Sequence, residues 1–363
     1  IRLVLNGEDR GIHVFVEQIT ETTLRNSELM PGDIYRGELV AKDTIPGITG
    51  SLFDSAALWD KVAVNNHFQE GSLAPLERLL EQVNESDSQD AQRELSQLLD
   101  MEAWGRFSAY ELLAGTKHFL PSHNWRLFYD PWRQKFLPIA WDPAGWMWNT
   151  NEIGPAVITT RLHSALFQNG DFLRARYVAL KEFFSLKKDR IFLQFVSNTI
   201  HLMESEIETD PFLYPGNTDI VKNAMRALEK KIVRQFSSAR EKWFDSEEPK
   251  ISAHYRETTL DLLVRGFHPV QKFRLTFDRE LSAKTLVHAH YETTHGKKIT
   301  DLSGSIEIDG KSMTFGSGFL SNHMILDDNR LVIKPNHFRV ELINIDPRAQ
   351  LMDLSANYGN GWL

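Results

Sequence analysis

The spacing of apolar residues changes in the second half of this chain, and that change limits what the chain can fold into. Between Asp171 and Phe244, apolar residues recur at the three-to-four-residue spacing of helices. Beyond Pro269, short runs such as residues 273–277 alternate apolar and polar side chains, which is typical of strands. A length of 363 residues supports two domains. The sequence therefore predicts an α+β protein with a mostly helical larger part and a small β-sandwich-like part.

The domain limits follow from this change of spacing. We expect a first domain at residues 1–245, a linker at residues 246–268 and a β-sandwich-like domain at residues 269–363. Within the first domain, Asp100 is the expected N-cap of a helix over residues 101–114, and Gly115 is its expected stop.

Two hairpins are predicted in the first domain. Residues 3–5 and 12–16 are apolar runs on either side of a segment that begins with Asn6-Gly7, a common hairpin turn. Residues 125–129 and 136–140 alternate across the polar turn between them. Both hairpins would place polar residues at the ends of rigid elements.

Composition excludes several classes of function. Lys and Arg number 41 against 49 Asp and Glu, so a net charge of −8 disfavours nucleic-acid binding. No run of 18 or more apolar residues is present, so no membrane span is expected. The absence of cysteine removes thiolate metal sites and cysteine nucleophiles. The chain opens in mid-pattern at Ile1, as an excised or processed fragment would.

Several familiar motifs fail on inspection. Residues 304–312 resemble a phosphate-binding loop, but five residues separate the glycines where four are required. The sequence has neither a His-Glu-x-x-His pair nor a Gly-x-Ser-x-Gly elbow, and residues 316–318 lack the context of a dinucleotide-binding loop. These absences argue against a zinc protease, an α/β-hydrolase and a Rossmann enzyme.

Polar residues that could carry chemistry gather between residues 115 and 149. His118, His123, Asn124 and Asp142 fall at the ends of the predicted helix and hairpin. The amide oxygen of Asn124 and the carboxylate of Asp142 suit a hard cation such as Mg²⁺. The alternative is structural, because Asp-Pro is common turn chemistry and a histidine or asparagine at such a junction often satisfies backbone groups.

A second cluster of histidines lies in the β-rich part. His288 and His290 are two residues apart on a predicted strand and so face the same side, with His295 following. They could form a metal site, and an exposed strand is the competing interpretation.

At this point the sequence resembles a known family. The segments 5–7, 11–18, 123–130 and 138–142 are similar, in order and spacing, to the CotH (spore-coat protein H) kinase family. The resemblance covers about residues 1–150 and extends more weakly to residue 245. It implies a truncated kinase-like domain, and a secreted or cell-surface bacterial protein related to atypical kinases, which use ATP with Mg²⁺ or Mn²⁺.

The resemblance also implies roles for individual residues. Asn124 would be the metal ligand of the catalytic loop, and Asp142 would hold Mg²⁺ on the phosphates. Glu17 and Gln18 would lie near adenine. Arg36, where relatives tend to have Lys, would be a cation close to the nucleotide.

The sequence departs from the family in ways that bear on activity. The family carries an aspartate shortly before His-Asn as the expected base, whereas no Asp or Glu occurs from residue 112 to 129. His118 is the obvious substitute base near Asn124. Ala144 replaces the second acid of the family's Trp-Asp-x-Asp. By strand order, the phosphate-covering loop and its Lys would precede Ile1.

Two hypotheses from different classes follow. In the first, the chain is an ATP- and metal-dependent phosphotransferase that acts on Ser or Thr of a protein substrate. In the second, it is a catalytically inactive pseudokinase whose fold serves as a surface or structural binding module for a polymer or protein partner. The missing aspartate favours the second hypothesis.

Overall fold

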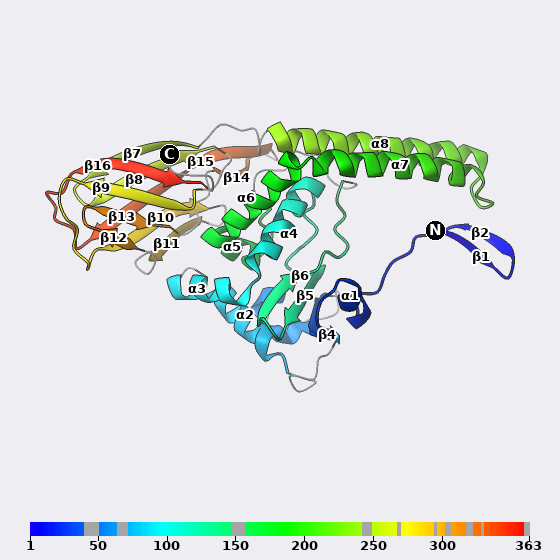
Figure 1. Cartoon of the computed structure of the whole chain (residues 1–363), viewed down its shortest axis with the longest axis horizontal. Helices are drawn as coiled ribbons and strands as arrows, with labels where there is room; N and C mark the ends of the chain where they lie inside the picture. The colour runs from blue at the N-terminus through cyan, green and yellow to red at the C-terminus, as the bar shows by residue number, and fades with distance from the viewer. Residues whose placement is uncertain are drawn as a thin grey trace.

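The structure is a computed structural model that describes residues 1–39, 51–63, 72–86, 88–146, 157–241, 249–266, 270–293, 296–301, 306–316, 322–327 and 330–358. Helices gather in the first part of the chain, and strands follow one another in the C-terminal part (Figure 1). The α+β class predicted from the sequence is confirmed, because helices and several antiparallel sheets occur together.

A four-stranded antiparallel sheet lies within the first part. Its order is β4 (Trp59–Ala63), β3 (Asp33–Gly37), β5 (Trp125–Asp130) and β6 (Lys135–Pro138). Strands β5 and β6 form the hairpin predicted for residues 125–140. The largest buried cluster joins Leu127 and Phe136 of this sheet to apolar side chains of the neighbouring helices and 3₁₀ turns. These elements are η1 (Leu52–Asp54), η2 (Ala56–Leu58), α2 (Ala74–Asn84), α3 (Gln89–Leu98), α4 (Met101–Ala114), α5 (Arg161–Phe167) and α6 (Gly170–Ser185).

The opposite face of the sheet is covered by a short helix, α1 (Glu21–Asn26). Leu24 of α1 packs against Ile34 of β3 and Phe128 of β5 in a smaller buried cluster. Because apolar side chains are buried on both faces, the sheet forms a rigid base for the loops at its ends.

Helix α4 begins and ends where the sequence predicts. The side chain of Asp100 accepts a hydrogen bond from the backbone N–H of Ala103, and Gly115 takes up the left-handed conformation with φ of 67°. Helix α6 crosses α4 at Gly105, where an added Cβ would lie 2.5 Å from the backbone nitrogen of Arg176. Only glycine allows so close an approach of the two helices.

Helices α7 (Lys188–Glu208) and α8 (Pro215–Ala239) form a long antiparallel pair that extends from the body of the first part (Figure 1). The sequence indicates one continuous apolar face on α7 from Phe192 to Ile207. The structure corrects this in part, because Phe195 is 64% exposed while Ile207 is buried. The apolar residues of α7 therefore extend around more of the helix surface than the part that α8 covers.

The N-terminal hairpin is confirmed, but its second strand was placed wrongly. Strand β1 (Arg2–Leu5) pairs with β2 (Glu8–Ile12), rather than with residues 12–16. Asn6 and Gly7 both have positive φ, which makes a two-residue turn and starts the second strand at Glu8. The apolar residues from Val14 to Val16 follow the strand and are exposed.

The hairpin contacts the turn between α7 and α8. The backbone N–H of Ile12 donates to the carboxylate of Asp210 at 2.6 Å. Arg2 forms an ion pair with Glu206 at 3.0 Å. The hydrogen bonds from Ile12 and Phe212 lower the pKa of Asp210 below its ordinary value, since they stabilise the charged carboxylate.

The C-terminal part consists of two antiparallel sheets. The larger contains β7 (Lys250–Arg256), β8 (Thr259–Arg265), β10 (Leu286–Thr293), β11 (Gly296–Asp301), β14 (Asn322–Asp327) and β15 (Arg330–Ile343). The smaller contains β9 (Lys272–Phe277), β12 (Glu307–Asp309), β13 (Ser312–Phe315) and β16 (Leu351–Asn357). Side chains from both sheets, including Leu262 and Phe273, share one buried cluster. Strands β7 and β8 lie in the segment that the sequence analysis expected to be a linker.

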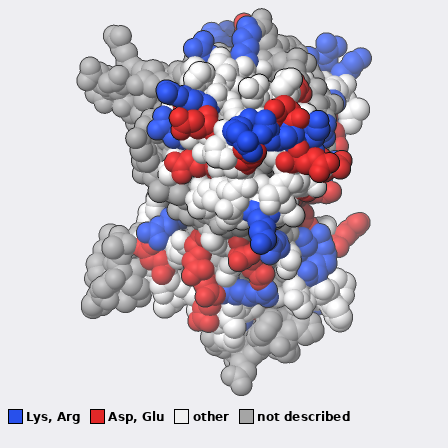
Figure 2. All heavy atoms as spheres, turned by 90° about the vertical axis from the view of Figure 1, so that its left-hand side faces the viewer, with Lys and Arg blue, Asp and Glu red and all other residues white. Residues whose placement is uncertain are grey.

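Positive and negative side chains are interspersed on the face of the molecule shown in Figure 2. In the C-terminal part, Arg279 contacts the carboxylates of Asp278 at 2.9 Å and Asp346 at 3.0 Å. Its hydrogen bond to Asp278 helps lower the pKa of that carboxyl to about 2. Among the helices that the structure describes, none is long and apolar enough to cross a membrane.

Candidate functional site

The candidate site is built around the C-terminal end of α4. The backbone N–H of Trp146 donates to the carbonyl of Ala114 at 2.7 Å, and the indole of Trp146 donates to the carbonyl of Leu113 at 3.0 Å. The hydroxyl of Thr116 donates to the carbonyl of Pro143. These bonds fasten residues 141–146 to the end of the helix, and so to the loop 115–124 that leaves it.

His118 is the residue that joins the two sequence-predicted metal ligands. Its Nδ1 lies 2.8 Å from Nδ2 of Asn124, which also donates to the carbonyl of His118 at 3.1 Å. The same Nδ1 lies 2.9 Å from the backbone oxygen of Asp142 and 3.7 Å from its Oδ2. The structure thus brings His118 close to both Asn124 and Asp142, and Asp142 lies 18 residues after Asn124 and 24 after His118 in the sequence.

The backbone of the site is unusual. Of ten non-glycine residues with positive φ in the described part of the chain, four lie here. They are Asn124 (70°), Asp142 (40°), Ala144 (45°) and Trp146 (54°). Such conformations are sparsely populated and persist where surrounding contacts enforce them, often at functional sites.

Two side chains at the site carry oxygen atoms that accept no hydrogen bond from the described residues. Oδ1 of Asn124 makes no hydrogen bond to any described residue, although the side chain as a whole is only 3% exposed. The carboxylate of Asp142 is exposed, and its nearest described ionic partner is His118. A hard cation prefers such oxygen ligands, so these two residues fit Mg²⁺ or Mn²⁺. In the part of the chain that is described, no group of three acidic or histidine side chains could hold a metal alone.

The ring of His118 has one nitrogen engaged and one free. Nδ1 faces the amide of Asn124, whereas Nε2 has no hydrogen-bond partner among the residues described. The backbone oxygen of Asp142 can only accept, so a neutral ring that donates to it from Nδ1 leaves Nε2 unprotonated. The ring of His123 lies 5.2 Å away in an edge-on orientation, and its Nδ1 is 3.2 Å from the hydroxyl of Ser122.

A buried arginine supports the segment that carries Asp142. Arg126 of β5 lies 5.1 Å from the ring of Trp141 and donates to Glu38 at 3.2 Å. Burial lowers the pKa of Arg126, although the hydrogen bond to Glu38 acts to raise it. Arg36 of β3 lies directly opposite Arg126 in the ladder and pairs with Asp60 at 2.6 Å. Directly opposite residues share a face of the sheet, so Arg36 lies on the Trp141 side.

Glu17 and Gln18 are placed differently. Both are exposed and lie between β2 and α1, outside any regular element. The carbonyl of Gln18 accepts a hydrogen bond from the hydroxyl of Thr23 at 3.0 Å. No hydrogen bond or ion pair among the described residues links either of them to His118, and their proximity to adenine stays a prediction.

Sequence reasoning missed a set of residues that support the site from below. They are Glu111, Thr116, Arg126, Thr159 and His163, which contact the site loops directly or through one another. A single sequence does not show which residue a buried Glu or His on a helix contacts. Only Thr116, directly after the helix stop at Gly115, stands where a loop anchor could be suspected.

The histidines of the β-rich part show no metal site in the described residues. His288 and His290 lie on β10, and His290 is 3.8 Å from Glu341. His295 lies outside the described residues.

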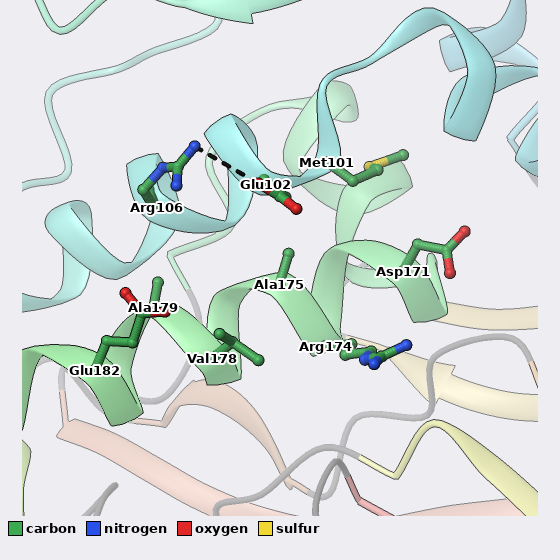
Figure 3. A pocket seen from close by; sticks show the side chains of 9 residues that line it. All are labelled: Met101, Glu102, Arg106, Asp171, Arg174, Ala175, Val178, Ala179 and Glu182. Carbon is green, nitrogen blue, oxygen red and sulfur yellow. Dashed lines mark ion pairs between the residues drawn. The ribbon is translucent and has the colours of Figure 1, made fainter. Parts of the chain in front are cut away.

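A separate groove of about 480 Å³ lies between α4 and α6. Figure 3 shows Ala175 and Val178 along it, with the Glu102–Arg106 ion pair at one side. None of the residues that line it is among the predicted site residues. The geometry around His118, rather than this groove, therefore defines the candidate site.

The fold and this geometry define an α+β protein with an oxygen-rich candidate cation site at a helix-to-hairpin junction. A family model described as CotH kinase protein matches residues 1–244. The chain therefore belongs to the CotH family, and the resemblance stated from the sequence is confirmed. No curated protein matches the chain.

Proposed function

We propose that this chain is a kinase-like protein that binds ATP with Mg²⁺ or Mn²⁺ and transfers a phosphoryl group to Ser or Thr of a protein substrate. Asn124 and Asp142 would hold the cation, and His118 would accept the proton of the substrate hydroxyl. Glu17, Gln18 and Arg36 would lie along the nucleotide. The proposal includes a kinase-like organisation of the first part, a sandwich-like C-terminal domain and a secreted or cell-surface location.

One observation supports this proposal above the others. The imidazole of His118 bridges the amide of Asn124 and the backbone of Asp142, while Oδ1 of Asn124 and the Asp142 carboxylate keep their lone pairs. A turn cap would use these oxygens to satisfy backbone N–H groups. Here no described backbone N–H donates to either group, and both residues contact His118.

The residues divide the chemistry in a simple way. A bound divalent cation would neutralise charge on the phosphates, which is the main requirement of phosphoryl transfer. Nε2 of His118 would take up the proton of the substrate hydroxyl, because it is unprotonated when Nδ1 donates to the backbone oxygen of Asp142. Arg36 would add positive charge beside the phosphates.

Calorimetric titration with Mn²⁺ and ATP tests the cation site. We expect Asp142→Ala to weaken binding at least roughly tenfold, because it removes the only charged ligand proposed for the cation. Asp353→Ala is the matched control, since Asp353 is an exposed aspartate on β16. Equal binding by the wild type and by both variants would reject Asp142 as a ligand.

A second candidate function is supported by a specific observation. Within the described residues, Asp142 is the only carboxylate paired with His118, and no acid occurs between residues 112 and 129. A kinase-like fold without the usual aspartate base could bind a partner protein or a surface polymer without transferring phosphate. Nucleotide binding without transfer of labelled γ-phosphate to a Ser/Thr-rich test protein would favour this function.

A further inference from the structure

A chain of buried and partly buried polar side chains contacts the loop that carries His118 and Asn124. Glu111 of α4 is fully buried, and its Oε1 lies 3.1 Å from Nε2 of His163, which is 1% exposed. Nδ1 of His163 lies 3.0 Å from the hydroxyl of Thr159. That hydroxyl donates to the carbonyl of Phe119, the residue that follows His118.

The direction of these hydrogen bonds can be assigned from the chemistry of the groups. A carboxylate only accepts, so the proton of His163 lies on Nε2 and points to Glu111. The single hydroxyl hydrogen of Thr159 is used by the carbonyl of Phe119. Nδ1 of His163 therefore accepts from the hydroxyl of Thr160 at 3.0 Å and from the backbone N–H of Thr159 at 3.4 Å, which links His163 to Thr159.

A second contact from His163 reaches the same loop. Its ring lies 5.2 Å from the ring of Trp125, the residue after Asn124. The indole N–H of Trp125 donates to the carbonyl of Leu120 at 2.8 Å. His163 thus supports two consecutive carbonyls of the loop, one through Thr159 and one through Trp125.

The buried charges of this network do not favour the stability of the fold. Oε2 of Glu111 is buried and has no hydrogen-bond partner among the described residues. Arg176, which burial shifts to a pKa of about 10, interacts with Glu111 electrostatically and donates to Ser108 at 3.1 Å. A partly satisfied buried carboxylate stabilises a fold less than an apolar side chain of similar size would. The value of the network therefore lies in the geometry that it fixes.

We infer that Glu111, His163 and Thr159 are positioning residues, which hold the loop at Phe119 so that His118 and Asn124 face Asp142. The inference rests on the proposed function for the role of that geometry in binding Mn²⁺-ATP. The geometry itself can be measured without a nucleotide.

Substitution of Thr159 tests the network with little change in side-chain shape. Thr159→Val keeps the shape of the side chain and removes the donor to Phe119, whereas Thr159→Ser restores a hydroxyl. Thr285→Val is the matched control, because the hydroxyl of buried Thr285 likewise donates to a backbone carbonyl, that of Ser282 at 2.8 Å, but in the C-terminal part.

The primary measurement is the NMR spectrum of the histidine rings in the protein without nucleotide. We expect Thr159→Val to shift the resonances of His118, identified with His118→Gln, and to leave those of His254 in β7 unchanged. Thr159→Ser should return them to the wild-type positions, and Thr285→Val should not move them. A His118 spectrum that is the same in the wild type and in Thr159→Val would overturn the inference.

The second measurement is the affinity for Mn²⁺-ATP. We expect Thr159→Val to weaken binding roughly tenfold, which corresponds to the loss of one well-placed hydrogen bond, while the first part stays folded at the temperature of the titration. If the wild type binds no nucleotide, the proposed function fails, while a shift of the His118 resonances still supports the positioning role. Unchanged affinity in Thr159→Val, with a wild type that binds, would contradict a role of the network in cation binding.

Discussion

At the scale of single residues, the site depends on residues whose backbone is held at positive φ, a conformation that most residue types disfavour. Asn124 and Asp142 tolerate the left-handed region better than most residues, because their short polar side chains can hydrogen-bond locally. Ala144 has no such compensation at φ of 45°. Contacts around it, from Trp146 to Ala114 and from Thr116 to Pro143, must therefore hold it there.

Ala144 offers a gain-of-function test. We expect Ala144→Asp to tighten binding of Mn²⁺-ATP roughly tenfold, because a second carboxylate beside Asp142 adds a charged oxygen ligand for the cation. It should also be at least as stable as the wild type, since Asp adopts positive φ more readily than Ala. Calorimetric titration and thermal denaturation measure the two effects.

Ala144→Asn separates the two causes in this test. Asn, like Asp, adopts positive φ more readily than Ala, but it adds no charge. Equal affinities in the Asp and Asn variants would show that the carboxylate is not near the cation.

At the scale of elements, the parts of the site that local patterns specify were predictable. The cap at Asp100, the stop at Gly115 and the hairpin β5–β6 each follow from a few adjacent residues. The second strand of the first hairpin was not predicted correctly. The apolar run after Ile12 resembles a strand, but the two-residue turn at Asn6-Gly7 fixes the register so that the second strand starts at Glu8.

The support beneath the site was beyond sequence reasoning for a different reason. Glu111 and His163 are 52 residues apart, and Thr159 and Phe119 are 40 apart. No periodicity connects positions on separate elements. Asn124 and Asp142 were singled out by their residue types and by their positions at the ends of the predicted helix and hairpin, and the family resemblance then implied a role for each in holding the metal.

The N-cap of α4 gives a prediction at this scale. Burial acts to raise the pKa of Asp100, but the hydrogen bonds from Ala103 and Arg133 outweigh it, so the pKa lies below its ordinary value. We expect Asp100→Ala to lower the free energy of unfolding by about 1–2 kcal/mol at neutral pH. Chemical denaturation measures this difference.

The pH dependence of that difference has a definite sign. A carboxyl whose pKa is lowered on folding contributes stability above its unfolded pKa, and loses it as the pH falls through the folded value. The effect of Asp100→Ala should therefore be full at pH 6 and shrink below about pH 4, near the ordinary pKa of aspartate. Asp90→Ala, at an exposed position in the first turn of α3, is the control. A difference that grows in acid would contradict the assigned charge of Asp100.

At the scale of the whole molecule, the buried clusters divide the chain into two parts. The clusters that surround the sheet β3–β6 and the helices contain residues of the first part only. The cluster shared by the two C-terminal sheets contains residues from Ile251 onward. Since each cluster is large enough to exclude water from its own elements, the two parts should unfold as separate cooperative units.

Core substitutions in each part test this division. Leu262 in β8 and Leu112 in α4 are both fully buried. We expect Leu262→Ala to destabilise one of two calorimetric transitions by about 2–5 kcal/mol and to leave the other in place, because a cavity is felt only by the unit that contains it. Leu112→Ala should move the other transition, together with the loss of Mn²⁺-ATP binding as α4 unfolds. A single transition that both substitutions lower equally would mean that the site of the first part depends on the C-terminal sheets for its stability.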